Sequence, residues 1–217
     1  MVKYYSTRGH KEGITFDDII LSGLAPDNGL YLPDSTTIES LTYLTQENLS
    51  YEDFVKTIFI SLDKASAKYL DNLSIYPGFQ NSPEPVLKDL DSKTMVMELF
   101  HGPTKSFKDY ALQPLGVIAD KRLLEISERG LVIVATSGDT GSAAINAVKD
   151  SENIDIVVLH PENKISEYQR KQMTSVIKEN VLNIAVKGSY DDCQKIAKEL
   201  LAKNPFKRKI ISLNSIN

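Results

Sequence analysis

Beyond residue 92, short apolar runs alternate with segments of helical character, and this alternation constrains the fold most. Residues 131–136 (LVIVAT) and 154–159 (IDIVVL) are continuous apolar runs, as expected of strands that are covered on both faces. Further strands are predicted at residues 94–100, 181–186 and 209–213. Strands that alternate with helices predict a parallel sheet with right-handed crossovers. The fold class is therefore α/β.

Residues 1–92 lack this alternation and are rich in turns, which predicts a mainly helical and loop region. A short helix is expected at residues 15–21, and a turn at residues 25–33. A second helix is expected from Ser50, because Ser50 and Asp53 can form a capping box. Prolines and glycine punctuate residues 76–92, so the predicted domains are residues 1–92 and residues 93–217.

Composition excludes several classes of protein. The net charge of -4 gives no general attraction to nucleic acid or to an anionic membrane. The single cysteine, Cys193, excludes an intrachain disulfide, and we expect it to be a buried thiol. No apolar run approaches the ~20 residues of a membrane span, and the first residues lack the apolar segment of a signal peptide. We therefore expect a cytoplasmic protein with no nucleic-acid or membrane partner.

The first loop of interest is HGPTKSFKD at residues 101–109, after a predicted strand, where sheets of this class bind ligands. A helix is predicted from Ser106 to near Gly130, which places Lys108 in its first turn. A cation there opposes the helix dipole by up to ~1 kcal/mol, and an amine kept partly neutral suits Schiff-base chemistry. From these residues alone, a solvated lysine balanced by Asp109 is the more common arrangement.

The second loop is TSGDTGS at residues 136–142, between a buried strand and a helix predicted at residues 142–149. Such a loop presents backbone N–H groups at a helix N-terminus, which suits a carboxylate or a phosphate. It matches neither the Walker A pattern nor GxGxxG, because its only glycines are Gly138 and Gly141. A capping turn without a ligand is the alternative.

Together these stretches resemble threonine synthase. HGPTKSFKD is followed about thirty residues later by ATSGDTGSAA. Four other stretches agree in the family's order: YSTRG at 5–9, GLAPD at 23–27, GSYDDCQ at 188–194 and LNSIN at 213–217. The resemblance runs from residue 4 to residue 217 and is closest to the longer bacterial and fungal branch of the family.

The resemblance implies the three-layer, parallel-sheet fold of pyridoxal-phosphate enzymes like the tryptophan synthase β subunit (fold type II). It also implies that the fold is incomplete here and carries an N-terminal, mainly helical and loop extension. Residues 1–92 would be the N-terminal threonine synthase region, and residues 93–217 the first part of the catalytic domain. The family's glycine-rich cofactor-phosphate loop follows the LNSIN motif, and residues 189–217 contain no glycine. We therefore expect this chain to be a fragment.

The resemblance also implies residue roles and a reaction. Lys108 would bind pyridoxal 5'-phosphate covalently and move protons on the substrate, and Asp139 and Asn214 would contact the cofactor. The substrate carboxylate would be bound by the second loop, through Ser137, Gly138, Asp139, Thr140 and Gly141. The implied reaction converts O-phosphohomoserine and water to L-threonine and phosphate, as a carbon–oxygen lyase acting on phosphates.

Two alternatives stay open. The chain could belong to a threonine-synthase-like phospho-lyase that eliminates phosphate from a related substrate, or to a truncated protein that binds partners without catalysis. No metal site is expected, because His10 and His160 have no partners at metal-ligand spacing. The complete enzyme is expected to be a monomer or a homodimer.

Overall fold

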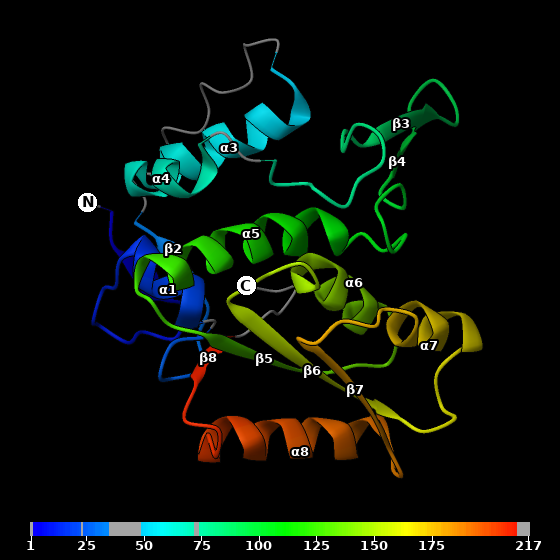
Figure 1. Cartoon of the computed structure of the whole chain (residues 1–217). Coiled ribbons are helices and arrows are strands. Elements are labelled where there is room, and N and C mark those ends of the chain that lie inside the picture. Colours follow the sequence, from blue (N-terminus) through cyan, green and yellow to red (C-terminus); the bar gives the residue numbers. More distant parts are fainter. Residues whose placement is uncertain (1, 23, 35–48, 72–73, 212–217) are drawn as a thin grey trace.

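The computed structural model describes residues 2–22, 24–34, 49–71 and 74–211, and its centre is a four-stranded sheet. The strands are β5 (Gly130–Ala135), β6 (Ile154–Pro161), β7 (Val181–Val186) and β8 (Lys209–Ile211). They lie in the order β7–β6–β5–β8, and every neighbouring pair is parallel (Figure 1). The predicted parallel sheet is thus confirmed, and its carboxyl ends share one edge.

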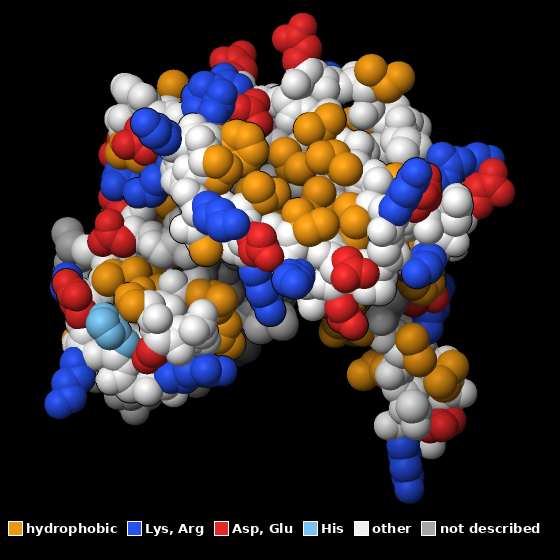
Figure 2. Space-filling model, turned by 90° about the horizontal axis from the view of Figure 1, so that it is seen from below, with side chains coloured by type: hydrophobic (Ala, Val, Ile, Leu, Met, Phe, Trp, Pro, Cys, Tyr) orange, Lys and Arg blue, Asp and Glu red, His pale blue; other side chains and the backbone are white. Residues whose placement is uncertain are grey.

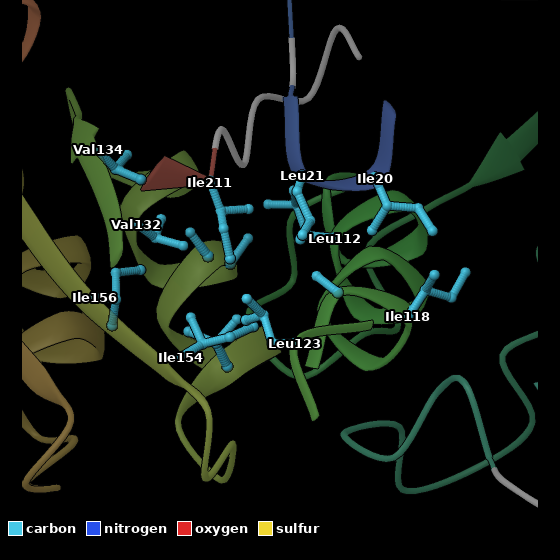
Figure 3. Close-up of a cluster of buried hydrophobic side chains, with 14 of the residues drawn as sticks. Ile20, Leu21, Leu112, Ile118, Leu123, Val132, Val134, Ile154, Ile156 and Ile211 are labelled. Carbon is cyan, nitrogen blue, oxygen red and sulfur yellow. The ribbon is translucent and has the colours of Figure 1, made fainter. Parts of the chain in front are cut away.

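Helices cover both faces of this sheet, so that helices, sheet and helices form three layers, as predicted for the fold class (Figure 1). On one face lies α8 (Tyr190–Lys203), where buried Cys193 and Ala197 pack against Leu131, Ile133 and Leu159. On the other face lie α1 (Phe16–Ser22), α5 (Asp109–Glu125) and α6 (Asp139–Val148). Figure 3 shows the larger core there, where Ile20 and Leu21 meet Leu112, Leu123, Val132 and Ile211.

The strands differ in how far they are covered. In β5, residues 130–134 are all buried, as its unbroken apolar run predicted. In contrast, β7 is an edge strand with exposed Leu182 and Ile184. Figure 2 shows apolar side chains gathered on the face that carries α8. The side chains of the central strand β5 are therefore buried, whereas those of the edge strand β7 are partly exposed to solvent.

The N-terminal region packs onto the outside of α5. The helix predicted from Ser50 is α3 (Tyr51–Leu62), where the Ser50 hydroxyl accepts a hydrogen bond from Asp53 N at 3.1 Å. It is followed by the 3-10 turn η2 (Lys64–Ser66) and α4 (Ala67–Leu70). β1 (Tyr4–Ser6) pairs antiparallel with β2 (Tyr31–Pro33), so the turn predicted up to residue 33 is shorter than expected.

An ion-pair network ties α1, α4 and α5 together. Lys68 Nζ lies 3.0 Å from Asp17 Oδ2 and 2.8 Å from Glu125 Oε1, and Arg122 Nη1 lies 2.6 Å from Glu125 Oε2. Hydrogen bonds from Lys68, Arg122 and Tyr69 lower the pKa of Glu125 to about 2. Glu125 is therefore ionised throughout the physiological pH range. As the last residue of α5, it links that helix to the N-terminal helix α4 through Lys68.

The strand predicted at residues 94–100 forms, but outside the parallel sheet. It is β4 (Met95–Glu98), which pairs antiparallel with β3 (Val86–Asp89) in a separate hairpin (Figure 1). The two strands are joined by a short turn in which Leu90 N donates to Thr94 O. Antiparallel strands joined by a short turn need no crossover helix, so β4 can pair with β3 without taking part in a βαβ unit.

Several helices begin at other residues than predicted, and two of these shifts concern the candidate site. The helix expected from Ser106 begins at Asp109, with Lys108 as its N-cap residue. The helix expected at 142–149 begins at Asp139. The helix between β6 and β7 is α7 (Glu167–Thr174). Within the described residues, no helix is long and apolar enough to cross a membrane.

The division into domains at residue 92 stays a prediction. The hairpin of β3 and β4 spans this position, and the larger core includes Tyr4 and Phe16 as well as Ile154 and Ile211. Residues from both regions therefore share one apolar core.

Candidate functional site

The two loops singled out from the sequence meet through one ion pair. Lys108 Nζ donates a hydrogen bond to Asp139 Oδ2 at 2.6 Å, although the residues are 31 positions apart. Lys108 precedes α5 and Asp139 begins α6, and these two helices pack against each other. The Lys108 side chain is only 11% exposed, whereas that of Asp139 is 45% exposed. The amine is thus shielded, and the carboxylate lies on the open side of the pair.

The Lys108 amine favours the ionised form of Asp139. Burial raises the pKa of Asp139, but the hydrogen bond and charge of Lys108, together with the Thr140 N–H, outweigh it and leave the pKa below its usual value. Lys108 Nζ also lies 4.3 Å from the centroid of the Phe107 ring, within cation–π range. The amine is therefore held by a carboxylate and by an aromatic face.

Close packing explains both glycines of the second loop. Gly138 has φ +144°, a conformation that other residues rarely adopt, and a Cβ atom there would lie 2.3 Å from the Gln169 side chain. A Cβ atom at Gly141 would lie 2.6 Å from both Thr136 Cγ2 and Met173 Sδ. The loop can therefore take this path only without side chains at these two positions.

Thr136 organises this loop, and sequence reasoning gave it no role. Its side chain is buried, and Oγ1 accepts hydrogen bonds from Gly138 N and Gly141 N, both at 2.9 Å. The signal available in the sequence was a hydroxyl two residues before a glycine at the end of a buried strand. Because Thr136 takes two N–H groups, fewer remain for an external anion.

Asp139 itself occupies part of the positive end of α6. Its Oδ1 accepts a hydrogen bond from Thr140 N at 2.9 Å, and the Ser142 hydroxyl donates to Asp139 O at 2.9 Å. Of the other predicted residues, Ser137 is exposed at the end of β5, and Thr140 is half-buried in the first turn of α6. The structure thus brings Lys108 and the loop together. The predicted Asn214 lies outside the described residues.

The lysine loop is held by Asp109, which does not balance a solvated lysine. Asp109 is fully buried, accepting hydrogen bonds from Thr104 N at 2.9 Å and from Thr104 Oγ1 at 2.7 Å. Burial raises the pKa of Asp109, and hydrogen bonds from Thr104 and Ser106 oppose that rise. A Cβ atom at Gly102 would lie 2.5 Å from Asp109 Oδ2, so the glycine makes room for this carboxylate. Asp109 thereby fixes the backbone that carries Lys108.

Helix α7 adds two glutamines that sequence reasoning missed. Gln172 Nε2 donates to Thr104 O in the lysine loop at 2.9 Å, and the Gln169 side chain lies against Gly138. The usable signal was their spacing of three on a helix that follows β6, whose carboxyl end lies at the same edge of the sheet. Within the described ranges, no three His, Cys, Asp or Glu residues gather as a metal site.

Known proteins similar to this chain include threonine synthases and threonine synthase-like proteins. A family model described as "Threonine synthase N terminus" matches residues 3–72. The chain is 39% identical to a threonine synthase of Pseudomonas aeruginosa over 100% of its own length and 48% of the relative. It is 38% identical to threonine synthase-like 2 of Xenopus laevis, again over 100% of the chain and 48% of the relative.

Solved structures give the same result. A PLP-bound threonine synthase from Brucella melitensis matches with a TM-score of 0.76 and 34% identity, over 100% of this chain and 48% of that one. The yeast threonine synthase matches with a TM-score of 0.80 and 32% identity, over 99% of this chain and 46% of that one. The chain thus spans about half the length of the proteins it matches. In sequence and in fold, the chain is similar to threonine synthases, and the model of their N-terminal region matches its residues 3–72.

Proposed function

We propose that the protein containing this chain is a threonine synthase. It converts O-phosphohomoserine and water to L-threonine and phosphate, and it is a lyase that acts on a carbon–oxygen bond to phosphate. The observation that carries the proposal is the 2.6 Å contact between Lys108 Nζ and Asp139 at the start of α6, in a chain similar throughout to threonine synthases. A reactive amine and a carboxylate-binding loop side by side are what this reaction requires.

The residues of the site fit pyridoxal phosphate. Lys108 offers a shielded primary amine beside an open carboxylate, and it would hold the cofactor covalently. Asp139 would contact the cofactor ring, and Asn214 would do so from outside the described residues. When bound, pyridoxal phosphate supplies an electron sink that stabilises carbanions next to the substrate nitrogen.

The loop before α6 binds and orients the substrate. The N-terminus of α6 attracts the substrate carboxylate through its dipole, and Ser137 and Thr140 add hydroxyl donors. The incoming carboxylate competes with Asp139 for the Thr140 N–H. Gly138 and Gly141 let the loop pass close to the side chains of Gln169, Thr136 and Met173.

Lys108 Nζ moves the protons of the reaction. It takes one proton from the substrate Cα and one from Cβ, and phosphate leaves from Cγ. A proton then returns to Cγ, which becomes the methyl group, the hydroxyl of water adds to Cβ, and a proton returns to Cα. The second proton of the water ends on the released phosphate. Asp139 orients this amine by accepting its hydrogen bond, and Asp109 and Thr104 hold the backbone on which it is mounted. The amine therefore starts each proton transfer from one fixed position.

The test of this function uses the complete protein. With O-phosphohomoserine, we expect threonine and phosphate in equal amounts. We also expect a visible absorbance band from the bound cofactor, which Lys108→Ala abolishes and Lys171→Ala, an exposed lysine on α7, preserves. A colourless wild-type protein that releases no phosphate would contradict the proposal and favour a binding role without catalysis.

A second candidate is a threonine-synthase-like phospho-lyase. It is favoured by the 38% identity to threonine synthase-like 2 of Xenopus laevis, which nearly equals the identity to the bacterial synthase. The same assay separates the two candidates, because a phospho-lyase releases phosphate from its substrate without forming threonine.

A further inference from the structure

Helix α7 lies against both loops of the site through two glutamines on one of its faces. Gln172 binds Thr104 O in the lysine loop, and Gln169, three residues earlier, lies against Gly138 in the loop before α6. The start of α7 is fixed, since Ser166 Oγ accepts a hydrogen bond from Gln169 N at 3.2 Å. The helix therefore presents Gln169 to the proposed substrate loop from a defined position.

The Gln169 carboxamide fills the space that a side chain at position 138 would need. A Cβ atom at Gly138 would lie 2.3 Å from Gln169 Cδ and Oε1, and 2.7 Å from Nε2. The positive φ of Gly138 favours glycine there, and the absence of a side chain leaves room for this polar group. The amide consequently lies beside the first turn of α6.

The orientation of the amide leaves a donor available. The Ser166 hydroxyl donates to Gln169 Oε1 at 3.0 Å, which turns Nε2 away from Ser166. Within residues 2–22, 24–34, 49–71 and 74–211, no hydrogen bond from Gln169 Nε2 is found. A primary amide with its oxygen fixed and its nitrogen free is suited to bind an oxygen acceptor.

The loop needs such a donor. Thr136 already takes the N–H groups of Gly138 and Gly141, and Asp139 takes that of Thr140. A carboxylate that arrives at α6 thus meets fewer backbone donors than a helix N-terminus normally offers, and it meets a second negative charge as well. A neutral amide supplies a donor without a new cation that would compete with Lys108 for Asp139.

We propose that Gln169 is a further substrate-binding residue, whose Nε2 donates a hydrogen bond to the carboxylate of the amino-acid substrate. This inference rests on the proposed function. It adds a residue of α7 to the site formed by the lysine loop and the loop before α6. Gln169 thereby selects substrates with a free carboxylate over neutral analogues.

The test compares Gln169→Glu with Gln194→Glu in the complete enzyme. Gln194 lies on α8 and bonds Tyr190 OH, so its variant makes the same change of charge away from the loop. Replacing a donor to a charged group by a second carboxylate should raise the KM for O-phosphohomoserine about tenfold or more. We expect the cofactor absorbance to be retained in Gln169→Glu, and the KM to be unchanged in Gln194→Glu.

A binding measurement makes the test independent of turnover. Calorimetry should show weaker binding of L-threonine to Gln169→Glu, with no loss for L-threoninamide, which lacks the carboxylate. Gln169→Ala removes the donor without adding charge and should give a smaller loss in the same direction. Equal L-threonine affinity in the wild type and both Gln169 variants would overturn the inference. A wild-type enzyme that holds the cofactor but forms no threonine would contradict only the proposed function.

Discussion

Replacing Thr136 by valine should loosen the loop before α6 while leaving the sheet intact. Valine has nearly the same shape as threonine and suits the end of a strand, so the change removes little except the hydroxyl. That hydroxyl is the acceptor for Gly138 N and Gly141 N, each at 2.9 Å, and the side chain is 1% exposed.

The magnitude follows from the two backbone N–H donors, Gly138 N and Gly141 N, that lose their acceptor. A buried donor left without an acceptor costs about 1–3 kcal/mol, so two of them set an upper range of about 2–6 kcal/mol. The first turn of α6 can shift slightly to relieve one donor, which brings the expected loss of unfolding free energy to about 3 kcal/mol. This is a large share of the 5–15 kcal/mol that is roughly typical of a whole domain.

Urea unfolding followed by far-ultraviolet circular dichroism measures this loss, with Thr136→Ser as the control. Serine keeps Oγ but loses the Cγ2 methyl that packs at Gly141, so it should cost only about 1 kcal/mol. If Thr136→Val is no less stable than Thr136→Ser, the two hydrogen bonds do not hold the loop and the reasoning fails.

Three further outcomes follow from the site and the ion network. Thr104→Val should destabilise the protein by about 1.5–3 kcal/mol in thermal unfolding, since the buried Asp109 loses a donor, while Thr104→Ser should stay near the wild type. Lys108→Met should raise the pKa of Asp139, measured by carbon NMR, because burial then acts without the opposing amine. In Glu125→Gln, the free energy of unfolding should fall less steeply as the pH is lowered than it does in the wild type. The lowered pKa of Glu125, about 2 against 4.5, means that its contribution is present above pH 4.5 and is lost toward pH 2.

The sequence was most informative where one physical cause dominates. The runs at 131–136 and 154–159 are apolar at successive positions, which only a strand covered on both faces explains, and both are central strands. The glycines at 138 and 141 marked the loop at the edge of the sheet where ligands bind in such folds. In both cases the pattern is local, so no knowledge of distant contacts was needed.

The hairpin at 86–98 was beyond this reasoning. Met95 and Met97 are more than half exposed, although their apolar character made residues 94–100 resemble a strand of the main sheet. Pro85 looked like a boundary, yet it directly precedes β3. An apolar run predicts that a strand forms, but it does not identify the partner strand. Here β4 pairs with β3, which a short turn joins to it.

The contacts that matter most at the site link residues whose spacing carries no pattern. Asp109 was paired with its neighbour Lys108 in the sequence, whereas in the structure it turns inward to Thr104, because a buried carboxylate needs backbone and hydroxyl donors. Gln169 was given no role from the sequence, whereas in the structure it lies against Gly138. Side-chain chemistry in a sequence thus identifies which loops can react. The supporting residues emerge only once packing shows which polar groups have lost their water and must find partners in the protein.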